Sequence, residues 1–283
     1  NPRANLESSV PEPTPAETVR KVMVIGGGVA GMEAARVAAL RGHRVRLFEA
    51  RPQLGGVVRF AAAHAPKMAS FGDIAWWQEA ELRRLGVEIF TARYTDADDV
   101  RAEAPDALVL ATGSRPRMDG GQRHRPGLAI AGIAQSHVIS SADALSLPRE
   151  KLGVSAVVLD DVGHYEGIAA AEHLINQGLQ VRYVMRHAAF APLMDACFRA
   201  EPAYARMRRT QRFHVHTRAT LSHIDAESVH IFDPTQDKLP TVVPATTVVL
   251  VGYNQPNDEL IRELGDFRSV DLHVIGDALS PRF

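Results

Sequence analysis

Three glycines near the start of the chain have the spacing of a turn that binds phosphate groups. Gly26, Gly28 and Gly31 form the pattern G-x-G-x-x-G between the apolar run 22–25 and the helix-forming stretch 29–40. In such a turn the first glycine permits a tight turn, the second lets a pyrophosphate approach the backbone, and the third lets the helix lie close to the sheet. Because the helix start also favours phosphate charge, the spacing predicts a site for the ADP portion of a dinucleotide.

An acidic residue completes this motif. Glu49 follows the second expected strand, 45–48, about twenty residues after the glycines, where a carboxylate bonds the ribose hydroxyls. A carboxylate there repels a 2′-phosphate, so the site disfavours NADP. The alternative is a glycine-rich turn that has lost its ligand. The strand before the turn and the helix after it favour the binding interpretation.

The elements around this motif predict an α/β fold with two Rossmann-like doubly wound domains, the second inserted in the first. Short apolar runs alternate with helical stretches, and the βαβ pattern restarts near residue 155. We expect a proline-rich linker at 1–18, an FAD- or ADP-binding domain at 19–148 and 246–283, and an inserted NAD(P)-binding-like domain at 149–245. The expected strands are 22–25, 45–48, 87–90, 107–110, 156–159, 181–184, 248–251 and 274–275, with helices at 29–40, 72–85 and 168–177.

The second βαβ unit departs from the glycine pattern. Counted back from the expected helix, its three glycine positions fall on Val162, His164 and Gly167. The His164 side chain stands where a pyrophosphate needs bare backbone, and the pair 160–161 (Asp-Asp) adds negative charge near two phosphates. The sequence therefore predicts no tight NAD(P)H binding in this unit.

The opposite interpretation of the second unit also has residues in its favour. Gly163 and Gly167 could form a turn, and Arg186 and His187 follow the second strand of the unit, where a 2′-phosphate would sit. In that case the inserted domain would bind NADPH.

Composition sets wider limits. The chain has 283 residues, 32 basic and 33 acidic side chains and a formal net charge of −1, so it has no long-range attraction for nucleic acid or an anionic membrane. No run approaches the roughly 20 apolar residues that span a bilayer. Cys197 is the only cysteine, which excludes an internal disulfide and a four-cysteine iron–sulfur cluster within this chain. A reduced, cytoplasmic setting is expected.

Both ends of the sequence suggest a piece of a longer polypeptide. The chain begins at Asn1 without methionine, and residues 9–18 form a proline-rich stretch. At the other end, the expected strand and turn at 274–277 are followed by six residues. We therefore expect a fragment.

Several motifs together resemble the two-dinucleotide-domain flavoproteins of the glutathione reductase type. The resemblance implies that Gly55-Gly56 lies over the pyrophosphate, that Thr112-Gly113 lies at the crossing between domains, and that Asp277 meets the ribityl chain. It implies no catalytic or metal-binding residue in this chain. The cofactor-binding residues that it implies are Gly26, Gly28, Val29, Ala30, Gly31, Glu49, Ala50, Arg51, Gly55, Gly56, Ala111, Thr112, Gly113, Gly276 and Asp277.

A narrower resemblance points to one branch of these flavoproteins. The segments 30–50, 105–120 and 157–174 resemble the C-terminal part of trimethylamine dehydrogenase and its relatives, which include histamine and dimethylamine dehydrogenases and, more distantly, 2,4-dienoyl-CoA reductase. In that family an N-terminal TIM barrel of old yellow enzyme type carries FMN, a [4Fe–4S] cluster and the substrate site. The resemblance implies that this chain holds FAD or ADP and lacks the barrel.

Three functions follow from this resemblance. The first is the nucleotide-binding portion of an iron–sulfur amine dehydrogenase in a homo-oligomer. Its expected partners are the barrel, as a domain or subunit, and an electron-transfer flavoprotein. The second is an NAD(P)H-dependent flavin reductase of the 2,4-dienoyl-CoA reductase type. The third is a non-catalytic module that binds ADP for structure. The lost glycines of the second unit favour the first function.

Other chemical signals are weaker. Four histidines lie in expected strands without a carboxylate or cysteine at ligand spacing, so we expect no zinc site. Trp76 and Trp77 are expected to fill core or an interface. Cys197 has no sequence partner that would mark a redox dithiol, and the pair 164–165 (His-Tyr) is expected to fill the vacated phosphate pocket. The four histidines are His214, His216, His223 and His230.

Overall fold

The chain forms two compact units in the computed structural model, which describes residue 9 and residues 12–234, 239–265 and 270–281. Unit 1 contains the residues up to Ser114 together with Pro256–Pro281, and unit 2 contains Arg115–Gln255. The chain passes between the units along β5 (Ser114–Arg115) and β16 (Gln255–Pro256), which pair with each other. Part of the expected 1–18 linker lies outside the described residues.

Unit 1 is a parallel five-stranded sheet in the order β17-β4-β1-β2-β3. Side chains alternate along β1: Val22 and Val24 pack under α1 and α3, whereas Met23 and Ile25 pack under α4 and α8. Its strands are β1 (Lys21–Ile25), β2 (Arg44–Phe48), β3 (Glu88–Phe90), β4 (Ala107–Leu110) and β17 (Asp271–Val274). Its helices are α1 (Val29–Leu40), α2 (Gly56–His64), η1 (Pro66–Phe71), α3 (Gly72–Arg84), α4 (Ala97–Glu103), α8 (Glu259–Leu264) and η4 (Gly276–Ala278).

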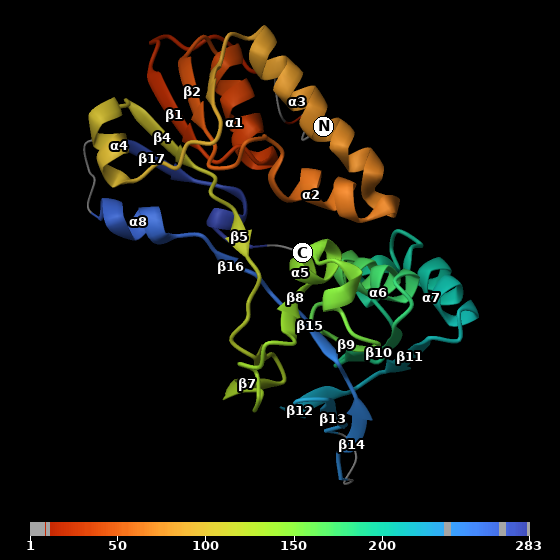
Figure 1. Cartoon of the computed structure of the whole chain (residues 1–283). Coiled ribbons are helices and arrows are strands. Elements are labelled where there is room, and N and C mark those ends of the chain that lie inside the picture. The colour runs from red at the N-terminus through yellow and green to blue at the C-terminus, as the bar shows by residue number, and fades with distance from the viewer. Residues whose placement is uncertain (1–8, 10–11, 235–238, 266–269, 282–283) are drawn as a thin grey trace. The chain divides into compact units, whose positions relative to one another are not determined.

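Unit 2 is built on a second parallel sheet, in the order β11-β10-β9-β15-β8. The helices α5, α6 and α7 lie on one face, and an antiparallel sheet, β12-β13-β14, packs its apolar side chains on the other (Figure 1). Its helices are α5 (Ser141–Ser146), η2 (Arg149–Lys151), α6 (Tyr165–Asn176), η3 (Pro192–Met194) and α7 (Ala200–Arg209). Its strands are β6 (Gly121–Gln122), β7 (Arg125–Ala129), β8 (Val138–Ser140), β9 (Ser155–Asp160), β10 (Gln180–Met185), β11 (Phe213–His216), β12 (Thr220–Ile224), β13 (Ser228–Phe232), β14 (Thr241–Pro244) and β15 (Thr247–Val251).

The two parallel sheets, with unit 2 inserted in a discontinuous unit 1, confirm the predicted fold class. The unit boundaries differ from the expected ones at 148/149 and 245/246. β15 pairs with β9 on one side and with β8 on the other, so both β8 and β15 belong to the second sheet. A fully apolar run such as that of β15 fits the centre of any parallel sheet, so its composition does not say which sheet it joins. In the described part of the chain, every helix is too short or too polar to cross a membrane.

Candidate dinucleotide site

The turn between β1 and α1 needs two of its three glycines for packing. Gly26 has φ +106°, and a Cβ there would overlap the carbonyl oxygen of Ala111 at the end of β4. A Cβ on Gly31 would overlap the carbonyl oxygen of Gly26, because α1 starts directly against the turn. These two glycines therefore let strand, turn and helix approach one another, as the sequence predicted.

Gly28 has a different environment. It is the N-cap of α1 in an extended conformation that any residue can adopt, and a Cβ built on it would meet no atom within 4 Å. No side chain caps the helix at this end, and its first turn contains no acidic residue. Packing therefore does not explain the glycine at position 28. A glycine there leaves open space beside the first amides of the helix, and a bound pyrophosphate needs this space.

A second helix begins at the same turn. Gly55, the N-cap of α2, donates its amide to the carbonyl oxygen of Gly27 at 2.8 Å. A Cβ on Gly56 would come within 3.2 Å of the Gly28 Cα. No side chain caps α2 either. The starts of α1 and α2 thus bring two partial positive charges beside Gly28, which suits an anionic ligand.

Glu49 follows β2 and faces the turn. One carboxylate oxygen accepts the amide of Gly27 at 2.7 Å, and the other accepts the amide of Arg51 at 2.7 Å. The side chain is half-buried, and each oxygen retains capacity to accept a further bond, as ribose hydroxyls require. Ala50 and Arg51 are exposed next to it. The structure therefore places Glu49 beside the glycine turn.

The segment after β4 is held by Asn257, a residue that no sequence motif indicates. The Thr112 hydroxyl donates to the carbonyl oxygen of Asn257 at 2.6 Å, and the Asn257 side-chain amide donates to the carbonyl oxygen of Thr112 at 3.0 Å. The amide of Asn257 donates to the carbonyl oxygen of Gly113 at 2.9 Å. Asn257 is far away along the chain and belongs to no motif, so only the fold reveals this clamp.

The turn after β17 lies against the start of α1. A Cβ on Gly276 would come within 2.9 Å of the Ala30 Cβ, so η4 packs closely on the first turn of the helix. The Asp277 carboxylate accepts the Ser114 hydroxyl at 3.1 Å. The motif residues predicted from the N-terminal and C-terminal parts of the sequence therefore gather at one end of the unit 1 sheet.

The helix α3 supplies a second unpredicted contact and corrects one expectation. The Gln78 side chain, 3% exposed, donates to the carbonyl oxygen of Val29 at 3.2 Å and so ties α3 to the first turn of α1. Trp76 and Trp77 are 71% and 48% exposed, so neither fills the core of unit 1. The core part of the expectation was wrong because Ala75, Gln78 and Leu82 supply the inward face of this helix, and the interface alternative stays a prediction.

In the corresponding turn of unit 2, a buried carboxylate bonds the backbone. The Asp160 carboxylate is fully buried, and one of its oxygens accepts the amides of Val162 and Gly163 at 2.9 and 2.8 Å. The Tyr183 hydroxyl donates to the other oxygen. Burial raises the pKa of Asp160. These two amides correspond to those of Gly26 and Gly27, which are also bonded within unit 1, so the Asp160 carboxylate holds the turn in shape.

The remaining residues of this turn are also engaged. A Cβ on Gly167 would overlap the Tyr183 hydroxyl, so this glycine makes room for a tyrosine. Arg186, considered above for a 2′-phosphate, forms an ion pair with Asp161 at 3.1 Å. His164 is the N-cap of α6 and is half-buried, and burial lowers its pKa.

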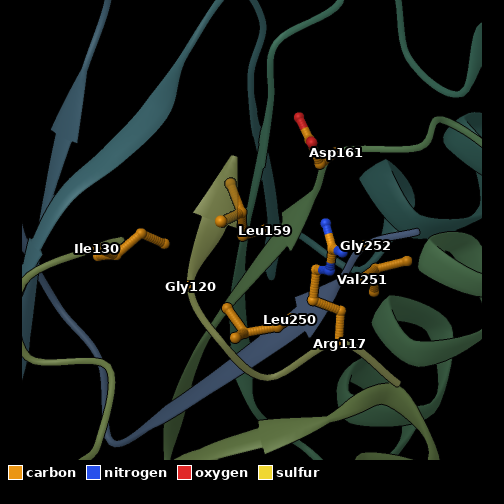
Figure 2. A pocket seen from close by; sticks show the side chains of 9 residues that line it. Arg117, Gly120, Ile130, Leu159, Asp161, Leu250, Val251 and Gly252 are labelled. Carbon is orange, nitrogen blue, oxygen red and sulfur yellow. The ribbon is translucent and has the colours of Figure 1, made fainter. Parts of the chain in front are cut away.

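A small cavity lies at the carboxyl ends of the central strands β9 and β15. Figure 2 shows the side chains of Leu159 and Leu250, paired across the two strands, with Gly120 alongside. The cavity measures about 20 Å³, which is room for about one water molecule. Ligands of parallel α/β sheets bind at this edge. This cavity is, however, too small for a nucleotide.

The four histidines considered for a zinc site lie on two sheets of unit 2. The strand β11 carries His214 and His216, whereas His223 and His230 place their Nε2 atoms 2.9 and 2.8 Å from the carboxylate of Asp225. Among the residues that the structure describes, no group of three or more His, Cys, Asp or Glu side chains is arranged to hold a metal ion. Cys197 is exposed.

Comparison with known proteins identifies the family to which this chain belongs. Residues 20–268 match the model of the pyridine nucleotide-disulphide oxidoreductase family. The match covers most of the chain, so the chain belongs to this family of oxidoreductases. Membership implies binding of a flavin and a nucleotide.

Individual relatives narrow the class. The NADH oxidase of Thermoanaerobacter brockii is 31% identical over 288 residues, which cover 98% of this chain and 41% of that protein. The N,N-dimethylglycine/sarcosine dehydrogenase of Chromohalobacter salexigens is 38% identical over 170 residues, 58% of this chain and 23% of that protein. The structure of histamine dehydrogenase from Rhizobium sp. 4-9 matches with a TM-score of 0.89 at 25% identity, over 98% of this chain and 43% of that chain.

These relatives confirm the resemblance to the C-terminal region of the trimethylamine dehydrogenase and 2,4-dienoyl-CoA reductase family. The chain is thus of a flavin-dependent oxidoreductase type that includes amine dehydrogenases and NAD(P)H reductases. It spans less than half the length of each of the three proteins.

Two glycine substitutions should have opposite effects. Gly28→Ala places its methyl group in open space, so we expect an unchanged urea midpoint without ligand but at least about a tenfold loss of affinity for FAD or ADP. Gly31→Ala overlaps the backbone and should lower the free energy of unfolding by about 1–3 kcal/mol or more. Urea denaturation and nucleotide titration measure both. Equal affinity in Gly28→Ala and the unchanged protein would contradict the site.

Removal of the buried carboxylate should destabilise unit 2. Asp160→Ala leaves two buried amides and the Tyr183 hydroxyl without their acceptor, which should cost about 2–4 kcal/mol. The matched control is Asp98→Ala, because the Asp98 side chain is 92% exposed and its loss should cost less than about 0.5 kcal/mol. Urea denaturation followed by circular dichroism compares the two. Similar midpoints for both variants would show that the Asp160 bonds contribute little.

Proposed function

We propose that this chain is the FAD- or ADP-binding portion of an iron–sulfur flavoprotein amine dehydrogenase. The supporting observation is the open space at Gly28, beside the starts of two uncapped helices and next to the Glu49 carboxylate. A pyrophosphate fits the open amides, and the carboxylate fits ribose hydroxyls. The residues present therefore suit the ADP portion that FAD and ADP share.

The residues of the site have separate tasks in this proposal. The amides at the starts of α1 and α2 hold the pyrophosphate, Glu49 orients the ribose and selects against a 2′-phosphate, and the turn with Asp277 accepts the ribityl chain. The clamp between Thr112 and Asn257 keeps the segment after β4 in place. When bound, FAD would supply electron transfer. This chain contributes binding and orientation.

Substrate oxidation is assigned in this proposal to a part of the longer protein. The relatives named as dimethylglycine/sarcosine and histamine dehydrogenases support an amine as substrate. The family resemblance supports an N-terminal barrel, as a domain or subunit, with FMN, a [4Fe–4S] cluster and the substrate site. An electron-transfer flavoprotein as electron acceptor and a homo-oligomeric assembly belong to the same proposal.

An NAD(P)H-dependent flavin reductase is the second candidate. It is favoured by the NADH oxidase, whose match covers nearly the whole chain. Two features of unit 2 oppose it: the His164 side chain stands at the position that corresponds to Gly28, and Arg186, considered for a 2′-phosphate, is paired with Asp161. Both features support the amine dehydrogenase branch. A purely structural ADP-binding module is the third candidate.

The nucleotide content of the purified protein tests the binding proposal. We expect close to one equivalent of FAD or ADP per chain after acid extraction and chromatography, because the pyrophosphate turn is open in the folded protein. A yellow protein with flavin absorbance identifies FAD, and a colourless one that releases ADP identifies ADP. A protein that carries neither and fails to bind either on titration would refute the proposal.

Titration with reduced pyridine nucleotides separates the first two candidates. We expect no saturable binding of NADPH or NADH below about 1 mM, because the His164 side chain stands at the position of the glycine that a pyrophosphate approaches. Isothermal titration calorimetry measures this whether the resident nucleotide is FAD or ADP. For a flavin-loaded protein, anaerobic stopped-flow absorbance gives the companion result, and rapid bleaching by NADPH would establish the reductase candidate instead.

A further inference from the structure

The side chain of Gln78, on the inward face of α3, reaches the first peptide unit of α1. Its Nε2 donates to the carbonyl oxygen of Val29 at 3.2 Å and lies 3.5 Å from a carboxylate oxygen of Glu33. The Glu33 carboxylate is itself held by the Arg36 guanidinium at 2.7 Å. The opposite orientation of the Gln78 amide would place its oxygen against these two oxygens, so the neighbours fix which end of the amide faces α1.

The Val29 carbonyl belongs to the same rigid group of atoms as an amide of the dinucleotide turn. A peptide bond is planar, so the C=O of Val29 and the N–H of Ala30 lie in one plane and point in opposite directions. Ala30 is the second residue of α1, and amides in the first turn of a helix have no acceptor within it. A hydrogen bond that fixes the Val29 carbonyl therefore also fixes the direction of the Ala30 N–H, and it polarises this N–H into a stronger donor.

The same helix also braces the start of α2. Ala75 lies about one turn before Gln78 on α3, and both side chains are buried. A Cβ built on Gly55, the N-cap of α2, would come within 2.9 Å of the Ala75 Cβ. One face of α3 thus contacts both of the helix starts that meet at Gly28, with an apolar contact at one and a hydrogen bond at the other.

Stability does not explain an amide side chain at position 78. The Oε1 atom of Gln78 is buried and has no hydrogen-bond partner in the described part of the chain, which costs free energy of folding. The Val29 carbonyl needs no side chain for its own pairing, because the helix supplies the amide four residues further on. An apolar side chain of the same length would avoid the cost and leave no backbone group unpaired. The amide therefore calls for a reason other than folding.

We propose that Gln78 is a positioning residue of the dinucleotide site, which directs the Ala30 amide toward the pyrophosphate through the Val29 carbonyl. This inference rests on the function proposed for unit 1 and adds to it a residue outside the glycine motif. Gln78 acts in this role through the backbone of α1. A Gln78 that served only the packing of α3 would contribute to folding and leave the Ala30 amide unaffected.

Nuclear magnetic resonance of the full chain tests the link from Gln78 to Ala30. Labelling of valine with carbonyl ¹³C and of alanine with ¹⁵N leaves two signals in an HNCO spectrum, because the sequence contains two Val–Ala steps, Val29–Ala30 and Val37–Ala38. The variant Gln78→Met keeps the length of the side chain and removes its donor. It should move the Ala30 signal well beyond any movement of the Ala38 signal, which serves as the internal control.

Calorimetric titration with ADP, on the chain freed of resident nucleotide, measures the effect on binding. Gln78→Met should weaken ADP binding at least about threefold, because a donor to the pyrophosphate is less well directed. Its urea midpoint without nucleotide should stay within about 0.5 M of that of the unchanged protein. The matched control Leu82→Met places the same side chain about one turn further along the buried face of α3. This control should leave the Ala30 signal in place and change the ADP affinity less than about twofold.

A second variant covers the case in which Gln78→Met does not fold. Gln78→Glu keeps the shape of the side chain, removes the donor and adds a negative charge near the Val29 carbonyl, so it should weaken ADP binding at least as much. Unchanged ADP affinity in a folded variant, or weaker binding with an unmoved Ala30 signal, would overturn the positioning role. Equal loss of affinity in Leu82→Met would assign the effect to packing and overturn it as well. Failure of the proposed function is a separate result, in which the folded, unchanged protein binds neither FAD nor ADP.

Discussion

Backbone amides at the start of a helix need an acceptor from outside the helix, and the N-cap residue decides whether a phosphate can reach them. At the turn before α1 the N-cap is Gly28, no side chain caps the helix, and a Cβ on Gly28 would meet no atom within 4 Å. At the turn before α6 the N-cap is His164, whose side chain stands at the position that corresponds to Gly28. One βαβ design thus yields an open glycine N-cap in unit 1 and a histidine N-cap in unit 2.

The open site depends on close packing around it. Gly26 and Gly31 allow strand, turn and helix to approach so tightly that a methyl group on either would overlap backbone, and Gly56 and Gly276 bring α2 and η4 against the same turn. The Glu49 carboxylate is fixed by two amides at the rim. The geometry of the site is therefore set by contacts within the protein itself, which favours preorganised binding.

Much of unit 1 could be predicted from the sequence because its signals are local. The glycine spacing, the position of Glu49 and the apolar runs depend on neighbours in the chain, so they reveal the turn and the strands around it. Asn257 and Gln78 could not be found, since their roles arise from contacts with distant segments. The sheet to which β15 belongs was likewise undetermined, because a fully apolar strand carries no mark of its partners. The sequence predicts Asp160 as a charge that repels phosphate. The structure shows that its carboxylate is buried and accepts hydrogen bonds from two backbone amides.

The two units also differ in how their stability depends on the concentration of nucleotide. A ligand that binds only the native state stabilises it in proportion to the logarithm of its concentration, and this applies to unit 1. The turn of unit 2 is held by the Asp160 carboxylate of the protein itself. Loss of nucleotide would therefore remove a stabilising contribution from unit 1 and leave the bonds that hold this turn of unit 2 unchanged.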